Sequence, residues 1–221
     1  MVRFEKVAKR YGDGPEILHD VSFALAPGSL HFVTGASGAG KTALLNIMAL
    51  AERPSAGALK LFDIDAEAAS RTVRARLRRR IGMVFQDCRF VDDRSIAENV
   101  ALPLQIDGAP LPRRRDNVAA LLEWLGLADK SELRPPALSA AERQRVALAR
   151  AVVRGPDLLL ADEPTGIGDE INALLFVDAL ERMLQRGTTV VVATRDTAFA
   201  DRFGHPRLHL DGGTLSGGVA S

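Results

Sequence analysis

The sequence predicts an α/β fold built on a P-loop core, and three observations lead to this prediction. A glycine-rich loop over residues 35–42 lies between an apolar run and a segment of helical composition. A later apolar run ends in two adjacent carboxylates, Asp162 and Glu163. The second half of the chain alternates apolar runs with helical segments, which is typical of a parallel sheet. We therefore expect a mostly parallel sheet with an antiparallel β subdomain at the N-terminus and an inserted helical subdomain.

The glycine-rich loop matches the phosphate-binding pattern G-x-x-x-x-G-K-[ST]. Glycines let successive backbone N–H groups wrap phosphate oxygens, and the following helix points its positive end at them. Lys41 is expected to reach the β- and γ-phosphates, and the Thr42 hydroxyl to ligate Mg²⁺. A chance glycine-rich turn would not be flanked by a strand-like run at 30–34 and a helical segment at 43–50. The nucleotide-binding residues are Gly35, Ala36, Ser37, Gly38, Ala39, Gly40, Lys41 and Thr42.

The N-terminal segment predicts paired strands. Residues 2–7 alternate in a strand-like way, residues 11–14 form a turn signal, and residues 17–25 read as further strands. Tyr11, the single tyrosine of the chain, lies in this turn. An exposed ring there could stack on a nucleotide base, because every base offers a π-face. The alternative is an ordinary aromatic residue on a surface turn.

Composition favours a cytoplasmic globular protein. The 221 residues carry a net charge of +1, so no overall basic field indicates nucleic-acid binding. The basic run at 74–80 is interpreted as a solvated helix face, since acidic residues elsewhere balance it. Cys88 is the single cysteine, which suits a reducing compartment. No signal-like segment and no run of about 18 apolar residues is found, so we expect no membrane span.

A helical region is expected to interrupt the core. Residues 58–62 and 81–86 are predicted to be strands and residues 65–80 a helix. From residue 87 onward the composition instead predicts helices interrupted by prolines. Helices are predicted over 95–104, stopping at Pro103, over 113–127, and from Leu138 onward, where Ser139 and Glu142 form a capping box. We expect a single domain, 1–221, with a core of 1–86 and 156–221 and a helical subdomain of 87–155.

The apolar run at 158–161 and the two carboxylates after it match the Walker B pattern. Asp162 is expected to hold Mg²⁺, and Glu163 to accept a proton from the water that attacks the γ-phosphate. The alternative, ordinary solvated acids at a strand end, does not account for the P-loop upstream. A helix over 169–185 and strands over 188–194 and 208–210 complete the expected order.

The motif order resembles that of ABC-type ATPase subunits. The resemblance rests on Phe85-Gln86, on the stretch from Leu138-Ser139 to 145–151, and on residues 161–166, and it spans the whole chain. It implies that Tyr11 stacks on adenine, that Gln86 senses Mg²⁺ and the transport partner, and that Asp169 belongs to the D-loop. It also implies a homodimer that sandwiches two ATP molecules, each between one P-loop and the partner's signature residues Ser139, Ala140 and Ala141.

A finer resemblance, at residues 85–94 and 99–104, is to the FtsE group of these subunits. It implies an integral membrane partner resembling FtsX, control of cell-wall hydrolases during division, and a peripheral location on the cytoplasmic face of the bacterial inner membrane. Subunits for lipoprotein release and macrolide export share most other motifs, and these alternatives stay open.

Three departures from the family pattern bear on the mechanism. Ala140 and Ala141 replace the usual two glycines of the signature, and Ile167-Gly168 precedes Asp169. Arg195 stands where the family has a switch histidine, and an arginine cannot copy the donor–acceptor role of neutral imidazole. Arg195 is expected to contact the γ-phosphate or to pair with Glu163. An ATPase of low turnover is the favoured interpretation, and a nucleotide-gated scaffold is the alternative.

Overall fold

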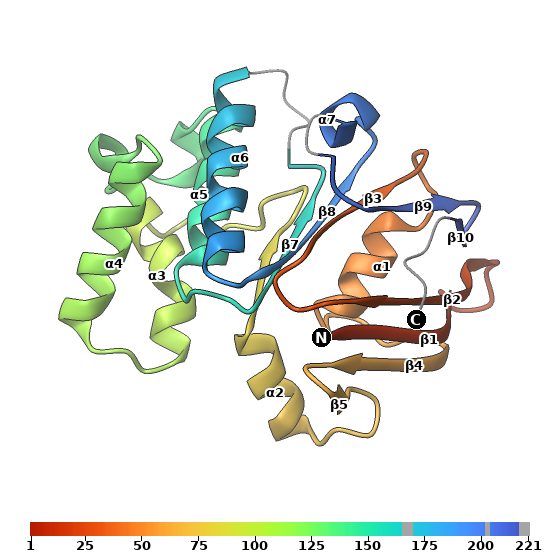
Figure 1. Ribbon diagram of the computed structural model, residues 1–221. Coiled ribbons are helices and arrows are strands. Elements are labelled where there is room, and N and C mark those ends of the chain that lie inside the picture. Colours follow the sequence, from red (N-terminus) through yellow and green to blue (C-terminus); the bar gives the residue numbers. More distant parts are fainter. Residues whose placement is uncertain (165–169, 202–203, 217–221) are drawn as a thin grey trace.

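The computed structural model describes residues 1–164, 170–201 and 204–216, and it contains two β-sheets (Figure 1). A four-stranded antiparallel sheet has the order β2-β1-β4-β5. A six-stranded sheet has the order β10-β9-β3-β8-β7-β6, and all of its pairings are parallel except that of β10 with β9. The strands are β1 (Val2–Arg10), β2 (Glu16–Leu25), β3 (Leu30–Thr34), β4 (Ala56–Leu61), β5 (Ile64–Asp65), β6 (Ile81–Val84), β7 (Leu158–Asp162), β8 (Thr189–Thr194), β9 (Arg207–Asp211) and β10 (Thr214–Ser216). The predicted fold class is confirmed.

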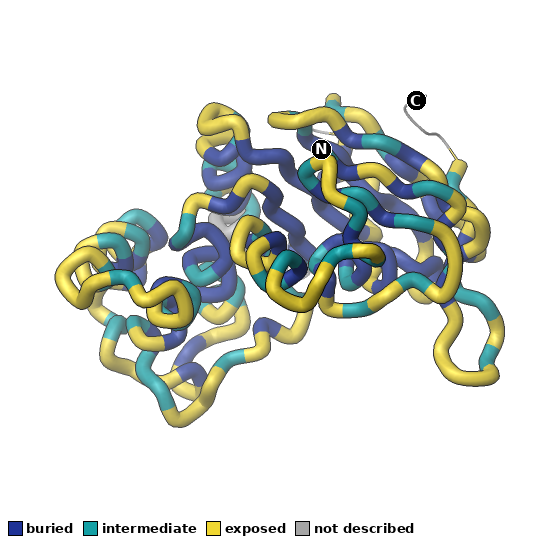
Figure 2. Tube along the Cα trace, turned by 90° about the horizontal axis from the view of Figure 1, so that it is seen from below, coloured by how far each residue is buried: buried dark blue, intermediate teal, exposed yellow. Residues whose placement is uncertain are grey.

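Helix α1 (Lys41–Met48) lies between the two sheets (Figure 1). Leu44, Leu45, Ile47 and Met48 are fully buried there. Strands β3, β7 and β8 are buried along their whole length, as continuous apolar runs become when both faces of a parallel sheet are covered (Figure 2). The start of α1 is therefore fixed at the carboxyl ends of the central strands.

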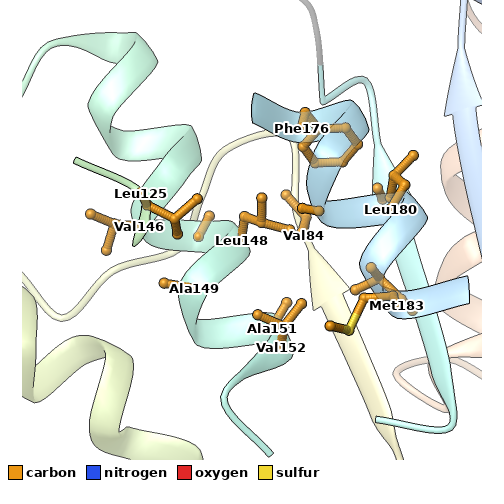
Figure 3. Close-up of a cluster of buried hydrophobic side chains, with 14 of the residues drawn as sticks. Val84, Leu125, Val146, Leu148, Ala149, Ala151, Val152, Phe176, Leu180 and Met183 are labelled. Atoms are coloured by element: carbon orange, nitrogen blue, oxygen red, sulfur yellow. The ribbon is translucent and has the colours of Figure 1, made fainter. Parts of the chain in front are cut away.

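The other face of the six-stranded sheet is covered by helices. Helix α5 packs over β6 and α6 over β8, and Figure 3 shows Leu148 of α5 and Val84 of β6 within one cluster with Phe176 and Leu180 of α6. Helices α3 and α4 pack outside α5. The helices on this side are α3 (Ile96–Ile106), α4 (Leu111–Trp124), α5 (Ala140–Val152) and α6 (Glu170–Gln185). Two 3₁₀ turns, Ala128–Lys130 and Pro135–Ala137, connect α4 with α5. Of the remaining helices, α2 (Arg71–Arg79) precedes β6 and α7 (Thr197–Asp201) follows β8.

Two expected helix boundaries were wrong. The helix expected over 65–80 begins only at Arg71, because the Asp65 carboxylate accepts the N–H groups of Glu67 and Ala68 in a turn, and Ser70 then caps α2. The helix expected to stop at Pro103 continues to Ile106. The carbonyl of Pro103 accepts the Arg154 guanidinium at 2.6 Å, which satisfies it within the last turn.

Smaller differences concern the helix ends. The helix expected at 113–127 spans Leu111–Trp124, with Pro112 in its first turn, where a proline is tolerated. The capping box of Ser139 and Glu142 is confirmed at the start of α5. Among the described residues, no helix is long and apolar enough to cross a membrane.

Candidate nucleotide-binding site

The P-loop connects β3 to α1 through backbone that only glycine can adopt. Gly40 has φ 101°, and a Cβ there would lie 2.7 Å from the Leu18 side chain. A Cβ at Gly35 would lie 2.3 Å from the carbonyl oxygen of Leu210 on β9. The glycine spacing of the motif is thus required by the close approach of neighbouring strands as well as by the ligand.

Lys41, the first residue of α1, is buried, and its ammonium is surrounded by acceptors. Its Nζ atom donates to the carbonyl oxygens of Gly35 at 2.8 Å and Ala36 at 3.0 Å, and it lies 3.6 Å from Oε1 of Glu163. A buried ammonium beside the glycine-rich loop suits a polyphosphate, whose oxygens can replace these acceptors.

Thr42 and Asp162 meet across 120 residues of sequence. The Thr42 hydroxyl donates to Oδ2 of Asp162 at 2.8 Å, while the buried Oδ1 has no hydrogen-bond partner among the described residues. Burial raises the pKa of the Asp162 carboxyl, against the effect of the Thr42 hydrogen bond. An unpaired buried carboxylate oxygen beside a hydroxyl fits a divalent cation.

Gln86 lies close to this pair. It lines a cavity of about 370 Å³ together with Thr42 and Asp162. No group of three or more His, Cys, Asp or Glu side chains that could hold a metal occurs in the described part of the chain. The oxygens of Thr42, Asp162 and Gln86 suit Mg²⁺, which takes one or two protein ligands and completes its shell with phosphate oxygens and water.

Glu163 stands in a strained backbone conformation just after β7. Its φ is 47°, in the left-handed region that non-glycine residues rarely adopt. Its N–H donates to the carbonyl of Ala193 on β8 at 2.8 Å, and its Oε2 accepts the N–H of Arg195 at 3.0 Å. The Arg195 Nε lies 3.4 Å from Oε1, although the arginine side chain is 58% exposed. The carboxylate is thus held between Lys41 and Arg195.

These side chains share one cavity of about 300 Å³. Tyr11 and Ile17 line it together with the P-loop, Glu163 and Arg195. The lining residues are Tyr11, Ile17, Ser37, Gly38, Gly40, Lys41, Thr42, Ala43, Gln86, Glu163 and Arg195. Ile17 was missed by sequence reasoning, because an apolar residue at the start of a strand has no chemical signal of its own.

The signature residues lie apart from this cavity. Ser139 caps α5 and Ala140 opens it, and both are exposed described residues that do not line the cavity. The Glu142 carboxylate accepts the N–H of Ser139 at 2.9 Å and pairs with Lys130. The Lys130 hydrogen bond, followed by that of Ser139, lowers the pKa of Glu142 to about 2. Asp169 lies outside the described residues.

The strand–loop–helix with its buried lysine, and the carboxylates at the end of the neighbouring strand, define a P-loop nucleoside triphosphatase. A family model adds the finer class: the model for ABC transporters matches residues 18–166. The chain belongs to this family, and it is an ATP-binding subunit with ATPase activity.

Known proteins similar to this chain include several ABC subunits. The chain is 43% identical to the cell division ATP-binding protein FtsE of Escherichia coli (strain K12), over 99% of both chains. It is 39% identical to the lipoprotein-releasing system ATP-binding protein LolD of Bordetella pertussis, over 96% of this chain and 93% of that protein. Among solved structures, the ATP-binding cassette MJ0796 in a dimeric post-hydrolysis state with ADP and Pi superposes with a TM-score of 0.91 at 30% identity, covering 98% of this chain and 97% of that one.

Proposed function

We propose that the chain binds Mg-ATP in the cavity between Tyr11 and Glu163, hydrolyses it slowly, and uses this cycle to move an integral membrane partner of the FtsX kind. One observation carries the catalytic part: the buried Lys41, the Asp162-bonded Thr42 and Glu163 line one cavity. The FtsE relative, similar over almost the whole chain, supports the cell-division role.

Each side chain has a defined task in the proposed reaction. Thr42 and Asp162, with Gln86 beside them, would hold Mg²⁺, which offsets the negative charge of the β- and γ-phosphates when bound. Lys41 exchanges the carbonyl oxygens of Gly35 and Ala36 for phosphate oxygens. Glu163 accepts the proton of the attacking water, with its orientation fixed by the N–H of Arg195.

Arg195 supports the slow rate. Its Nε and the Lys41 ammonium both lie near Oε1 of Glu163, so the water must compete with two cations for the base. A bound γ-phosphate offers Arg195 a second anionic partner, and in that position its charge would stabilise the phosphoryl group. When the Arg195 guanidinium moves from Glu163 to the γ-phosphate, the Glu163 carboxylate becomes free to act as the base, so nucleotide binding is linked to catalysis.

A second copy of the chain is proposed to complete the site. Ser139, Ala140 and Ala141 are presented at the N-terminus of α5, where backbone N–H groups suit an anion, but they do so away from their own P-loop. The solved relative MJ0796 is described as dimeric. We expect the ATP-bound form to be a homodimer in which each signature segment meets the partner's nucleotide.

The membrane partner is proposed to dock on the helical segment 87–155. A groove of about 710 Å³ runs between α3 and α4, and Ala97, Ala101, Leu111 and Val118 supply apolar lining. Val91, in the loop before α3, is 38% exposed and is tied to α3 through Asn99, whose side chain bonds both its N–H and its carbonyl. Docking there places the subunit on the cytoplasmic face of the bacterial inner membrane.

The loop also contains Phe90, the apolar residue next to Val91. Phe90 packs against the helical core and under the Arg150 guanidinium, 5.0 Å from the ring centroid. A charge at Phe90 therefore threatens folding, and Val91→Asp is the cleaner variant. Ile64→Asp is its matched control, because Ile64 is 37% exposed but lies on the antiparallel sheet.

Single-turnover ATP cleavage, measured with and without the FtsX-like protein in vesicles, tests the proposal. We expect slow cleavage by the subunit alone and faster cleavage with the partner. Val91→Asp should abolish the stimulation and the recruitment to vesicles while leaving ATP affinity unchanged. Ile64→Asp should leave stimulation, recruitment and ATP affinity unchanged. Absence of cleavage in both conditions would favour the nucleotide-gated scaffold.

A lipoprotein-release role is the second candidate, because LolD is 39% identical over nearly the whole chain. Co-purification of the subunit with either class of membrane protein distinguishes the two. Recovery of a lipoprotein-releasing permease rather than an FtsX-like protein would overturn the cell-division assignment.

A further inference from the structure

We propose that Glu52 is a positioning residue for the nucleotide base: it holds the hydroxyl end of Tyr11 so that the ring is presented to the base in one orientation. This inference rests on the proposed role of Tyr11 in the nucleotide site. Glu52 follows α1 in a loop, outside every motif of the sequence, and does not line the nucleotide cavity described above.

Three polar groups converge on the Glu52 carboxylate, and the Glu52 backbone makes a further bond to Asn46. The Tyr11 hydroxyl donates to Oε2 at 2.7 Å, and the Lys9 ammonium lies 2.9 Å from the same atom. The Asn46 amide donates to Oε1 at 3.0 Å, and the Glu52 N–H donates to the Asn46 carbonyl at 3.2 Å. The carboxylate thus has fixed partners on both oxygens.

This network joins the ring to the phosphate cradle. Asn46 lies one helical turn after Thr42 on α1, the helix that begins with Lys41. Tyr11 belongs to the turn after β1, and this network ties it to α1. The distance between the base and the phosphates of a nucleotide is fixed by covalent bonds, so a ring tied to α1 is held where a base can reach it. Pre-organisation of this kind reduces the entropy lost on binding.

Lys9 determines which face of the ring is available. Its Nζ lies 4.8 Å from the ring centroid, and it is held there by the Arg53 carbonyl at 2.8 Å as well as by Glu52. An ammonium over one face occupies that face and leaves the other for stacking. Tyr11 is 47% exposed and lines the nucleotide cavity, so we expect the other face to receive the base.

The protonation states support the same arrangement. Burial, followed by the hydrogen bond and the charge of Glu52, raises the pKa of Tyr11 to about 12. Burial alone would raise the pKa of Glu52, but the hydrogen bonds of Tyr11, Lys9 and Asn46 outweigh it and lower that pKa. At neutral pH the Tyr11 hydroxyl therefore stays protonated and hydrogen-bonded to Glu52, so only the face of the ring is available to a base.

Ligands with and without a base test the inference. Affinities are measured for Mg-ATP and for inorganic tripolyphosphate, which occupies the phosphate cradle alone. Glu52→Gln should weaken ATP binding roughly fivefold, about 1 kcal/mol, and leave tripolyphosphate binding unchanged. Glu67→Gln is the matched control, since the Glu67 side chain is 26% exposed against 25% for Glu52 and pairs with Arg74 instead; it should change neither affinity.

Tyr11→Ala separates this inference from the proposed site. It should weaken ATP binding about tenfold or more, and Glu52→Gln should add nothing in that background. Parent affinity in Tyr11→Ala would overturn the stacking role itself. Weakened binding in Tyr11→Ala with parent affinity in Glu52→Gln would overturn the positioning role alone, as would equal losses for ATP and tripolyphosphate.

Tyrosinate absorbance supplies a direct signal, because Tyr11 is the single tyrosine of the chain. At a pH of about 11, with folding checked by circular dichroism, the parent phenol should stay largely protonated. Glu52→Gln removes the negative charge and should lower the pKa, so that the tyrosinate band appears. An unchanged titration in Glu52→Gln would overturn the proposed contact.

Discussion

The phosphate end of the molecule and the signature end of α5 are built in opposite ways. At the phosphate end, Thr42 bonds Asp162 and Arg195 contacts Glu163, across 120 and 32 residues of sequence. At the signature end, Ser139 and Glu142 satisfy each other within one helical turn, with Lys130 beside them. The first region is assembled by tertiary structure and the second by local capping. One chain therefore contains a nearly complete binding site and, separately, an anion-binding helix end that needs another molecule to act on.

Glu163→Gln tests the phosphate end most severely. The change keeps the shape of the side chain and removes its proton-accepting charge, so cleavage should fall by roughly 10²- to 10⁴-fold. ATP should stay bound and the dimer should accumulate, because Lys41 and Asp162 are unchanged. Single-turnover cleavage and size-exclusion chromatography with ATP measure the two effects, and Glu123→Gln on the exposed side of α4 is the control. Cleavage at the parent rate would show that the base lies elsewhere.

Lys41→Ala should remove most of the binding that the phosphate end provides. Loss of a buried ammonium aimed at phosphates should weaken Mg-ATP by about 2–3 kcal/mol, roughly 30- to 150-fold, in monomer-binding titrations. Ser139→Ala, at the other end, should leave the affinity of the monomer unchanged and impair only the ATP-dependent dimer. If Ser139→Ala weakened monomer binding of Mg-ATP as much as Lys41→Ala does, the signature end would be part of the binding site of the same chain.

Restoring the family residues should connect the two ends. Arg195→His frees Glu163 from a guanidinium, and Ala140→Gly with Ala141→Gly removes two methyl groups from the surface that meets a γ-phosphate. The triple variant should cleave ATP about three- to tenfold faster, an effect on the order of 1 kcal/mol, with little change in affinity. Steady-state hydrolysis measures the gain, and urea unfolding checks the helix, since each added glycine costs up to about 1 kcal/mol. A rate equal to the parent's would mean that these three residues do not limit turnover.

Glu142→Gln should have the smallest effect, confined to stability. The folded-state pKa of Glu142 is lowered to about 2, so its contribution is present above the pKa of the unfolded chain and is lost as pH falls towards 2. The variant should be about 1 kcal/mol less stable at pH 7 and should lose less stability between pH 4.5 and pH 2 than the parent. Urea unfolding at several pH values measures both. Glu98→Gln, in the matching capping box of α3, is the control without a lysine partner.

The helix boundaries show how local and distant effects divide. The capping box at Ser139 was predictable, because donor and acceptor lie three residues apart and depend on one turn of backbone. The continuation through Pro103 was not, because the helix loses only one backbone donor there, and the Pro103 carbonyl still accepts the N–H of Asp107 and the guanidinium of Arg154, 51 residues away. The helix predicted from Asp65 was delayed by a turn that the Asp65 side chain itself forms, a signal that was present in the sequence and was outweighed by helical composition.

The sequence by itself determined the P-loop and the Walker B strand, because each depends on residue types within a short window, and the order of such motifs along the chain determined the ABC family. Tertiary structure decided the rest. The bonds between Thr42 and Asp162, Glu163 and Arg195, and Tyr11 and Glu52 span 120, 32 and 41 residues. They exist because the strand order brings β3, β7 and β8 side by side and because the loop after α1 folds back towards β1. No local pattern encodes which strand ends become neighbours. The contacts of Arg195 with Glu163 and of Glu52 with Tyr11 could therefore be identified only in the folded chain.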